Sequence, residues 1–177
     1  MTGRDTMAEQ RSGTQSTPPG STPAVEVIGG RRVVIPVETT HQNGTTPVVR
    51  TMDLRCRSGA WFSKTWRGLP LLGLLEDAAA PADTTHLVVE ADDGHTACVP
   101  IGDVLEGLLA LERSDGERPT RTDRMPRVVA PGLDGPHAVK NITRIEAVAF
   151  SPEDDPDDVG QFDFESVPSS EGVDDEE

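Results

Sequence analysis

Short runs of β-branched residues, each bounded by a glycine or proline turn, recur through the middle of this chain and constrain its fold more than any other feature. Ala24 to Ile28 and Arg31 to Val37 flank the dipeptide Gly29-Gly30, which is typical of a hairpin turn. Val48 to Leu54 follows a second turn signal, Asn43-Gly44. This part of the chain therefore predicts a hairpin followed by a third strand.

The second half of the chain repeats the pattern. His86 to Glu90 and His95 to Val99 are separated by Asp92-Asp93-Gly94, which predicts another hairpin. Arg127 to Ala130 predicts a short buried strand, and Val139 to Phe150 predicts a long final strand.

Two leucine-rich stretches interrupt the strands at helical spacing. Pro70 suits the first turn of a helix, where its missing N–H costs nothing, and Pro81 ends that helix. The expected buried face of this helix consists of Leu71, Leu72, Leu74, Leu75 and Ala78. A second helix is expected from Ile101, with an apolar face of Val104, Leu105, Leu108 and Leu109, before a charged loop from Glu112 to Arg124. The fold class predicted is α+β, dominated by mixed β-sheet with a few short helices.

The 177 residues divide into one folded domain and two tails. Residues 1–23 are rich in Thr, Ser, Gly, Gln and Pro, and residues 151–177 carry twelve acidic residues and no basic ones. Because both segments have little apolar surface to bury, they are predicted to be disordered, and the domain is expected to occupy residues 24–150. The formal charge of −15 disfavours nucleic acid as a partner, since phosphate binding needs a basic face.

The sequence predicts a cytoplasmic protein. No apolar run approaches the length of about 18 residues that a membrane span requires. Arg31-Arg32 resembles a twin-arginine signal, but only Val33 to Val37 follows before Glu38, which is too short for an export core. The two cysteines are 42 positions apart and suggest no disulfide framework, as is usual in a reducing compartment.

Cys56 is well placed to be a metal ligand. It lies where the third predicted strand gives way to a Gly- and Ser-containing loop, between Arg55 and Arg57, whose positive field favours the thiolate that binds soft metals. The alternative is an inert, buried cysteine. Cys98 falls in the middle of a predicted strand and is expected to be a small buried hydrophobe.

Two blocks of sequence together resemble a known family. The first contains Arg55-Cys56, Trp61 and Trp66-Arg67-Gly68-Leu69-Pro70-Leu71. The second contains Pro126-Arg127-Val128-Val129-Ala130-Pro131-Gly132, Gly135 and Val139-Lys140-Asn141-Ile142-Thr143-Arg144-Ile145-Glu146. In this order and at this separation they resemble the oxidoreductase molybdopterin-binding domain family of the sulfite oxidase type, from Val25 to Phe150. The resemblance implies a sulfite-oxidase-type molybdopterin-binding fold.

The resemblance also implies a cofactor site. Cys56 matches the family's single thiolate ligand of molybdenum, and Arg127 and Lys140, 13 positions apart, match two basic residues that hold the pterin and its phosphate. Ala138 and Val139 match a backbone stretch that lies along the pterin. Plain strand packing is the alternative for these two residues, and pairing with a carboxylate is the alternative for Arg127.

His137 lies beside this matched segment, in the glycine turn. It would either contact the phosphate or serve as a catalytic acid or base. The alternative is a solvent-exposed loop histidine. We expect Cys56, Arg127 and Lys140 to converge on one pocket, with His137 at its rim.

The function that the resemblance implies is a molybdopterin-dependent oxidoreductase, which transfers an oxygen atom or electrons at a cysteine-ligated molybdenum centre. Its partners would be a small-molecule substrate and an electron-transfer protein, without nucleic acid or membrane. The alternative is a cofactor-free binding module that retains the fold. Departures from the family pattern favour that alternative: Thr122 and Ala91 stand where asparagine and threonine are frequent, and the chain has no tyrosine.

Overall fold

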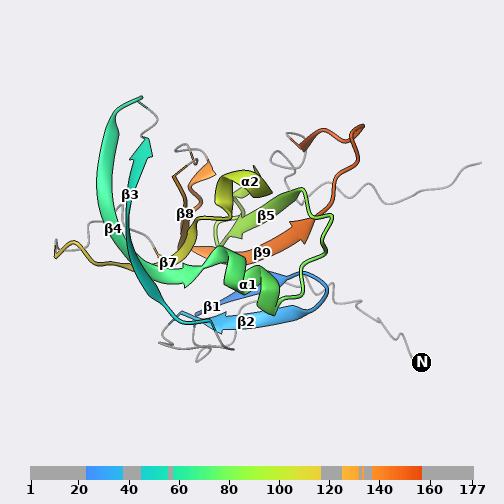
Figure 1. Cartoon of the computed structure of the whole chain (residues 1–177), viewed down its shortest axis with the longest axis horizontal. Helices are drawn as coiled ribbons and strands as arrows, with labels where there is room; N and C mark the ends of the chain where they lie inside the picture. Colours follow the sequence, from blue (N-terminus) through green and yellow to red (C-terminus); the bar gives the residue numbers. More distant parts are fainter. Residues whose placement is uncertain are drawn as a thin grey trace, which may run out of the picture.

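The structure, a computed structural model, describes residues 23–37, 45–55, 58–116, 125–131, 133 and 137–156. These residues form two β-sheets and two short helices (Figure 1). The α+β class and the mixed sheet predicted from the sequence are confirmed.

The first sheet has five strands in the order β2-β1-β9-β5-β6. Their bounds are β1 Ala24–Ile28, β2 Arg32–Pro36, β5 His86–Ala91, β6 Thr96–Pro100 and β9 Ile142–Val148. β1 and β9 run parallel, whereas the other neighbours run antiparallel. Both predicted hairpins, β1–β2 and β5–β6, are confirmed. β9 is shorter than predicted, because Asn141 takes a positive φ of 53° immediately before it.

The second sheet has four antiparallel strands in the order β3-β4-β7-β8. Their bounds are β3 Val48–Arg55, β4 Trp61–Pro70, β7 Leu108–Arg113 and β8 Arg127–Val129. β3 and β8 confirm predicted strands. β4 was not among the strands predicted from the sequence, and its ten residues pair with β3 and β7. β3 and β4 together form the long curved hairpin of Figure 1.

The first predicted helix is confirmed in position but not in its whole buried face. α1 (Leu71–Asp77) begins directly after Pro70 and buries Leu71, Leu74 and Leu75. Leu72 is 47% exposed, so the prediction that it is buried was wrong. Successive side chains on a helix point about 100° apart, which turns Leu72 away from the side that faces the core.

The second predicted helix is wrong beyond its first turn. α2 spans only Ile101–Val104, Leu105 is 39% exposed, and β7 contains Leu108, Leu109 and the first residues of the predicted charged loop. Gly107 lies too close to β8 for a side chain, since a Cβ there would stand 2.7 Å from the Val129 carbonyl oxygen. Pairing with β4 and β8 therefore decides the conformation of this leucine-rich stretch.

The two faces of the second sheet belong to different apolar clusters. One face, with Leu69, Leu109 and Val128, joins the main core together with the first sheet and α1. The opposite face, called here the Trp66 face, carries a second cluster of buried residues, Met52, Leu54, Trp66, Leu108, Ala110 and Val129. Because side chains alternate along a strand, Arg127 shares this face with Ala110, its partner in register.

Neither helix among the described residues has the length or the apolar character of a membrane-spanning segment.

Candidate functional site

Arg127 and Lys140 are direct neighbours. The backbone of Arg127 pairs with Ala110 of β7 on one side and forms an isolated antiparallel bridge with Lys140 on the other. Residues opposite each other in an antiparallel pair point to the same side, with Cβ atoms about 5 Å apart. The bridge therefore places both basic side chains on the Trp66 face.

Arg127 stacks on the indole of Trp66. The guanidinium carbon lies 5.1 Å from the ring centroid, which is the geometry of a cation–π contact. Trp66 is 1% exposed and Arg127 is 8% exposed. Such a contact is stronger when water is excluded, so this arginine is held in a defined place on the face.

The Trp66 face offers hydrogen-bond donors at this point. The buried indole nitrogen of Trp66 has no hydrogen-bond partner among the described residues. A buried N–H without an acceptor is costly, and the Arg127 guanidinium lies over the same indole, with Lys140 the backbone neighbour of Arg127. A phosphate or a pterin ring supplies acceptors for donors of this kind, so the residues present fit molybdopterin on this face.

Cys56 lies outside the described residues, and its role as the metal ligand stays a prediction. On its N-terminal side, Arg55 ends β3 and pairs with Trp61 at the start of β4. This pair is five positions along the strands from the Arg50–Trp66 pair, or about 17 Å at the rise of a β-strand. Convergence of Cys56 with the two basic residues therefore requires a binding surface that extends along the Trp66 face.

Ala138 and Val139 lie immediately before the bridge. The side chain of Val139 is 2% exposed and belongs to the main core, and its backbone N–H donates to the His137 carbonyl oxygen at 2.9 Å. Ala138 is half-buried. The side chain of Val139 thus serves packing, as in the alternative interpretation, so only backbone atoms of this residue remain for a pterin contact.

His137 is exposed and lines a pocket beside the edge strand β6. This pocket, of about 380 Å³, is lined by His86 of β5, Val99 of β6 and Asp103 of α2, among others, and neither Arg127 nor Lys140 is among its described lining residues. Cys98 also lines it and is half-buried rather than fully buried as predicted, because β6 is an edge strand. Within the described chain, no group of three His, Cys, Asp or Glu side chains could hold a metal ion.

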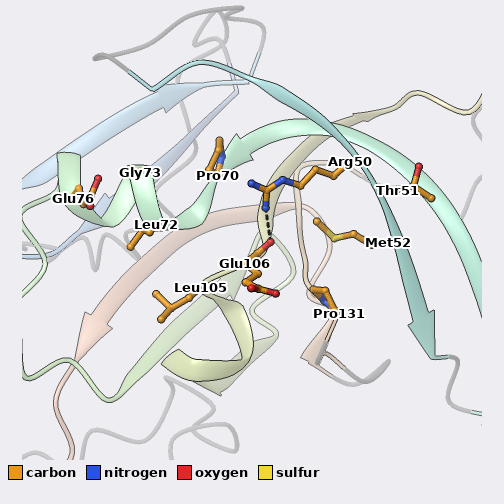
Figure 2. Close-up of a pocket in the computed structure, with 10 residues that line it drawn as sticks. All are labelled: Arg50, Thr51, Met52, Pro70, Leu72, Gly73, Glu76, Leu105, Glu106 and Pro131. Carbon is orange, nitrogen blue, oxygen red and sulfur yellow. Dashed lines mark hydrogen bonds between the residues drawn. The ribbon is translucent and has the colours of Figure 1, made fainter.

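A second pocket, of about 570 Å³, opens at the base of the β3–β4 hairpin (Figure 2). Arg50 lines it and is the cross-strand partner of Trp66. Its Nη1 donates to the Glu106 carbonyl oxygen at 2.9 Å, which ties β3 to the end of α2. Met52 and Pro131 line the same pocket, so it adjoins the Trp66 face.

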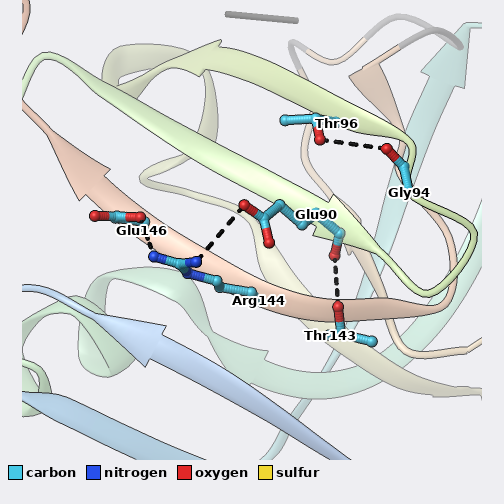
Figure 3. Close-up of polar contacts among 6 residues, drawn as sticks. All are labelled: Glu90, Gly94, Thr96, Thr143, Arg144 and Glu146. Carbon is cyan, nitrogen blue, oxygen red and sulfur yellow. Dashed lines mark hydrogen bonds and ion pairs between the residues drawn. The ribbon is translucent and has the colours of Figure 1, made fainter. Parts of the chain in front are cut away.

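The outward face of the first sheet carries charges that pair with one another (Figure 3). Arg144 lies 2.6 Å from a Glu146 oxygen and 3.8 Å from a Glu90 oxygen, and Thr143 donates to the Glu90 carbonyl oxygen at 3.4 Å. These side chains are partly exposed, and exposed ion pairs contribute little free energy. This cluster is a solvated sheet surface, and the candidate site remains the Trp66 face.

Sequence reasoning missed the roles of Trp66 and Arg50 on this face. Trp66 stands within the first block of the family resemblance, but its contact with Arg127 joins residues 61 positions apart. Only the pairing of β4 with β7, and of β7 with β8, brings these two residues to one face.

The described fold is that of a molybdopterin-binding domain of the sulfite oxidase type. The sulfane dehydrogenase SoxCD from Paracoccus pantotrophus has a similar fold, with a TM-score of 0.61 and 19% identity over 76% of this chain. The chain spans 40% of that SoxCD chain. A family model, oxidoreductase molybdopterin binding domain, matches residues 33–155, and the chain belongs to this family. No curated protein matches the chain.

Proposed function

We propose that this protein binds a molybdenum-molybdopterin cofactor on the Trp66 face and acts as an oxidoreductase that transfers an oxygen atom or electrons. The observation that carries the proposal is the bridge between Arg127 and Lys140, which makes two basic residues neighbours where Arg127 contacts the indole of Trp66. Membership of the oxidoreductase molybdopterin binding domain family supports it.

Each residue has a distinct part in this proposal. Arg127 would bind the cofactor's phosphate through two N–H groups of its planar guanidinium, and Lys140 would add a point charge. Cys56 would supply the thiolate ligand of molybdenum. When bound, the cofactor provides the redox chemistry, while the protein supplies binding, orientation and charge.

The exposed imidazole of His137 is three positions before Lys140. It would serve as an acid or base if the substrate enters from the 380 Å³ pocket that it lines. A small-molecule substrate and an electron-transfer protein complete the proposal. A cytoplasmic location stays a prediction from the sequence.

Metal analysis of three proteins tests this function. Wild type, Cys56→Ser and Cys98→Ser are produced in a host that makes molybdopterin, and molybdenum is measured per protein chain. We expect near-stoichiometric molybdenum in wild type and in Cys98→Ser, and its loss in Cys56→Ser. Cys98 is the matched control, since it is the only other cysteine and lies in β6. Wild-type protein without molybdenum would favour the cofactor-free binding module instead.

A further inference from the structure

We infer that Trp66 is a positioning residue, whose indole ring fixes the Arg127 guanidinium in the orientation that binds the cofactor's phosphate. This inference rests on the proposed function. It concerns a residue that would act through Arg127 and not through the reacting atoms.

The strand register explains how the two side chains meet. Arg127 on β8 is in register with Ala110 on β7, and Ala110 is in register with Gly68 on β4, two residues beyond Trp66. Ala110 is fully buried between them. Because Gly68 has no side chain and Ala110 has only a methyl group, the arginine side chain is able to cross β7 and reach the indole.

Stacking and phosphate binding use different properties of the guanidinium. The contact with the indole depends on its positive charge, since the guanidinium carbon of Arg127 lies over the ring, whereas phosphate accepts hydrogen bonds from its N–H groups. Both contacts are therefore compatible. An arginine side chain carries about 2 kcal/mol of rotamer entropy, and a ring that restrains the side chain before binding reduces the loss on binding.

The chain contains a second arginine–tryptophan contact for comparison. Arg55 lies 6.0 Å from the ring centroid of Trp61 at the far end of the β3–β4 hairpin. Trp61 is 66% exposed, whereas Trp66 is 1% exposed. Solvent weakens a cation–π contact, so only the Trp66 pair is expected to hold its arginine firmly.

The first arm of the test measures cofactor retention. Wild type, Trp66→Phe, Trp66→Met and Trp61→Met are produced with the cofactor, dialysed at increasing salt, and assayed for molybdenum and pterin. We expect Trp66→Met to bind the cofactor about tenfold more weakly, because methionine is apolar but has no π face to contact the guanidinium. Trp66→Phe should recover most of the affinity, and Trp61→Met should match wild type. Thermal unfolding of each protein without cofactor shows whether a variant loses the cofactor because it is less stable.

A double-mutant cycle shows whether Trp66 acts through Arg127. In an Arg127→Gln background, Trp66→Met should cause no further loss of cofactor, whereas a purely structural role would leave the two losses additive. Additive losses overturn the inference. Normal retention in Trp66→Met together with loss in Arg127→Gln overturns it as well, while leaving the proposed function intact.

The second arm requires neither cofactor nor a Trp66 substitution. The Trp61→Phe variant leaves Trp66 as the only tryptophan, so its fluorescence reports on the ring beside Arg127. We expect Arg127→Gln to change this emission and Arg32→Gln, on β2 of the other sheet, to leave it unchanged. If Arg127→Gln leaves the Trp66 emission unchanged, Arg127 does not stack on Trp66 and the inference is overturned. Absence of molybdenum from wild type overturns the proposed function, and with it the role of Trp66 toward the cofactor.

Discussion

Arg127 and Lys140 join the two sheets of the protein at a single antiparallel bridge. Arg127 begins β8 at the edge of the second sheet, and Lys140 is two residues before β9, the central strand of the first sheet. Each residue is therefore fixed by a different sheet. The separation of the two backbones at this point is set by their pairing.

The bridge predicts separate effects on binding and stability when Lys140 is replaced. Lys140 is exposed, so Lys140→Gln should change the free energy of unfolding by less than about 0.5 kcal/mol. It should weaken retention of the cofactor, since one cation near the phosphate is lost. Molybdenum content after dialysis and urea denaturation measure the two effects. Arg32→Gln removes a positive charge from β2, the edge strand of the first sheet, and an equal loss of molybdenum in that variant would contradict a local role for Lys140.

Two truncations test where the folded domain ends. Phe150 packs edge-to-face on His86 at 5.1 Å, and its backbone N–H donates to the Thr85 hydroxyl at 2.9 Å. Deleting residues 157–177 removes nine acidic residues and little apolar surface, so stability should change by less than about 1 kcal/mol. Deleting residues 150–177 should cost about 2 kcal/mol, the sum of one aromatic contact and one hydrogen bond. Equal thermal stability of both truncated proteins would contradict the packing role of Phe150.

Local signals in the sequence were sufficient for the hairpins. Gly29-Gly30 and Asp92-Asp93-Gly94 mark turns between β-branched runs, and each turn joins strands that are adjacent in the chain. Pro70 likewise marks the start of α1. The family resemblance further predicts a shared role for Arg127 and Lys140, and their backbone pairing is a feature of the tertiary structure.

The features that the sequence did not predict depend on pairing between strands that are distant in the chain. Leu108 and Leu109 follow Val104 and Leu105 at helical spacing, and a short apolar run does not distinguish a helix from a buried strand. The choice depends on β4, which starts 47 residues before β7. The stacking of Arg127 on Trp66 depends on the same strand order, so no local pattern reveals it.

Helix α1 contains one buried and one exposed leucine, and truncating each of them tests how much burial in the main core contributes to stability. Leu74 is 1% exposed and Leu72 is 47% exposed, on the same seven-residue helix. Leu74→Ala should lower the free energy of unfolding by about 2–5 kcal/mol, because it leaves a cavity in a packed core. Leu72→Ala should change it by less than about 0.5 kcal/mol. Urea denaturation of the two variants checks this, and similar losses would mean that Leu72 is buried in solution.

Gly68 is predicted to be essential for the approach of β4 to β7. A Cβ at this position would stand 2.2 Å from the Leu109 carbonyl oxygen and 2.7 Å from the Ala110 Cα, at the irregularity where the register shifts between Arg67 and Gly68. These are backbone atoms that cannot rotate away, so Gly68→Ala should cost about 1–3 kcal/mol of stability, as overpacking does.

The same substitution should also weaken cofactor retention, because it displaces the strand that lies between Trp66 and Arg127. Gly102→Ala in α2 is the control, since a Cβ there meets no atom within 4 Å and alanine favours helix. The control should retain both stability and molybdenum. If Gly68→Ala also retains both, the close contact of β4 with β7 is absent in solution, and the route by which Arg127 reaches Trp66 is wrong.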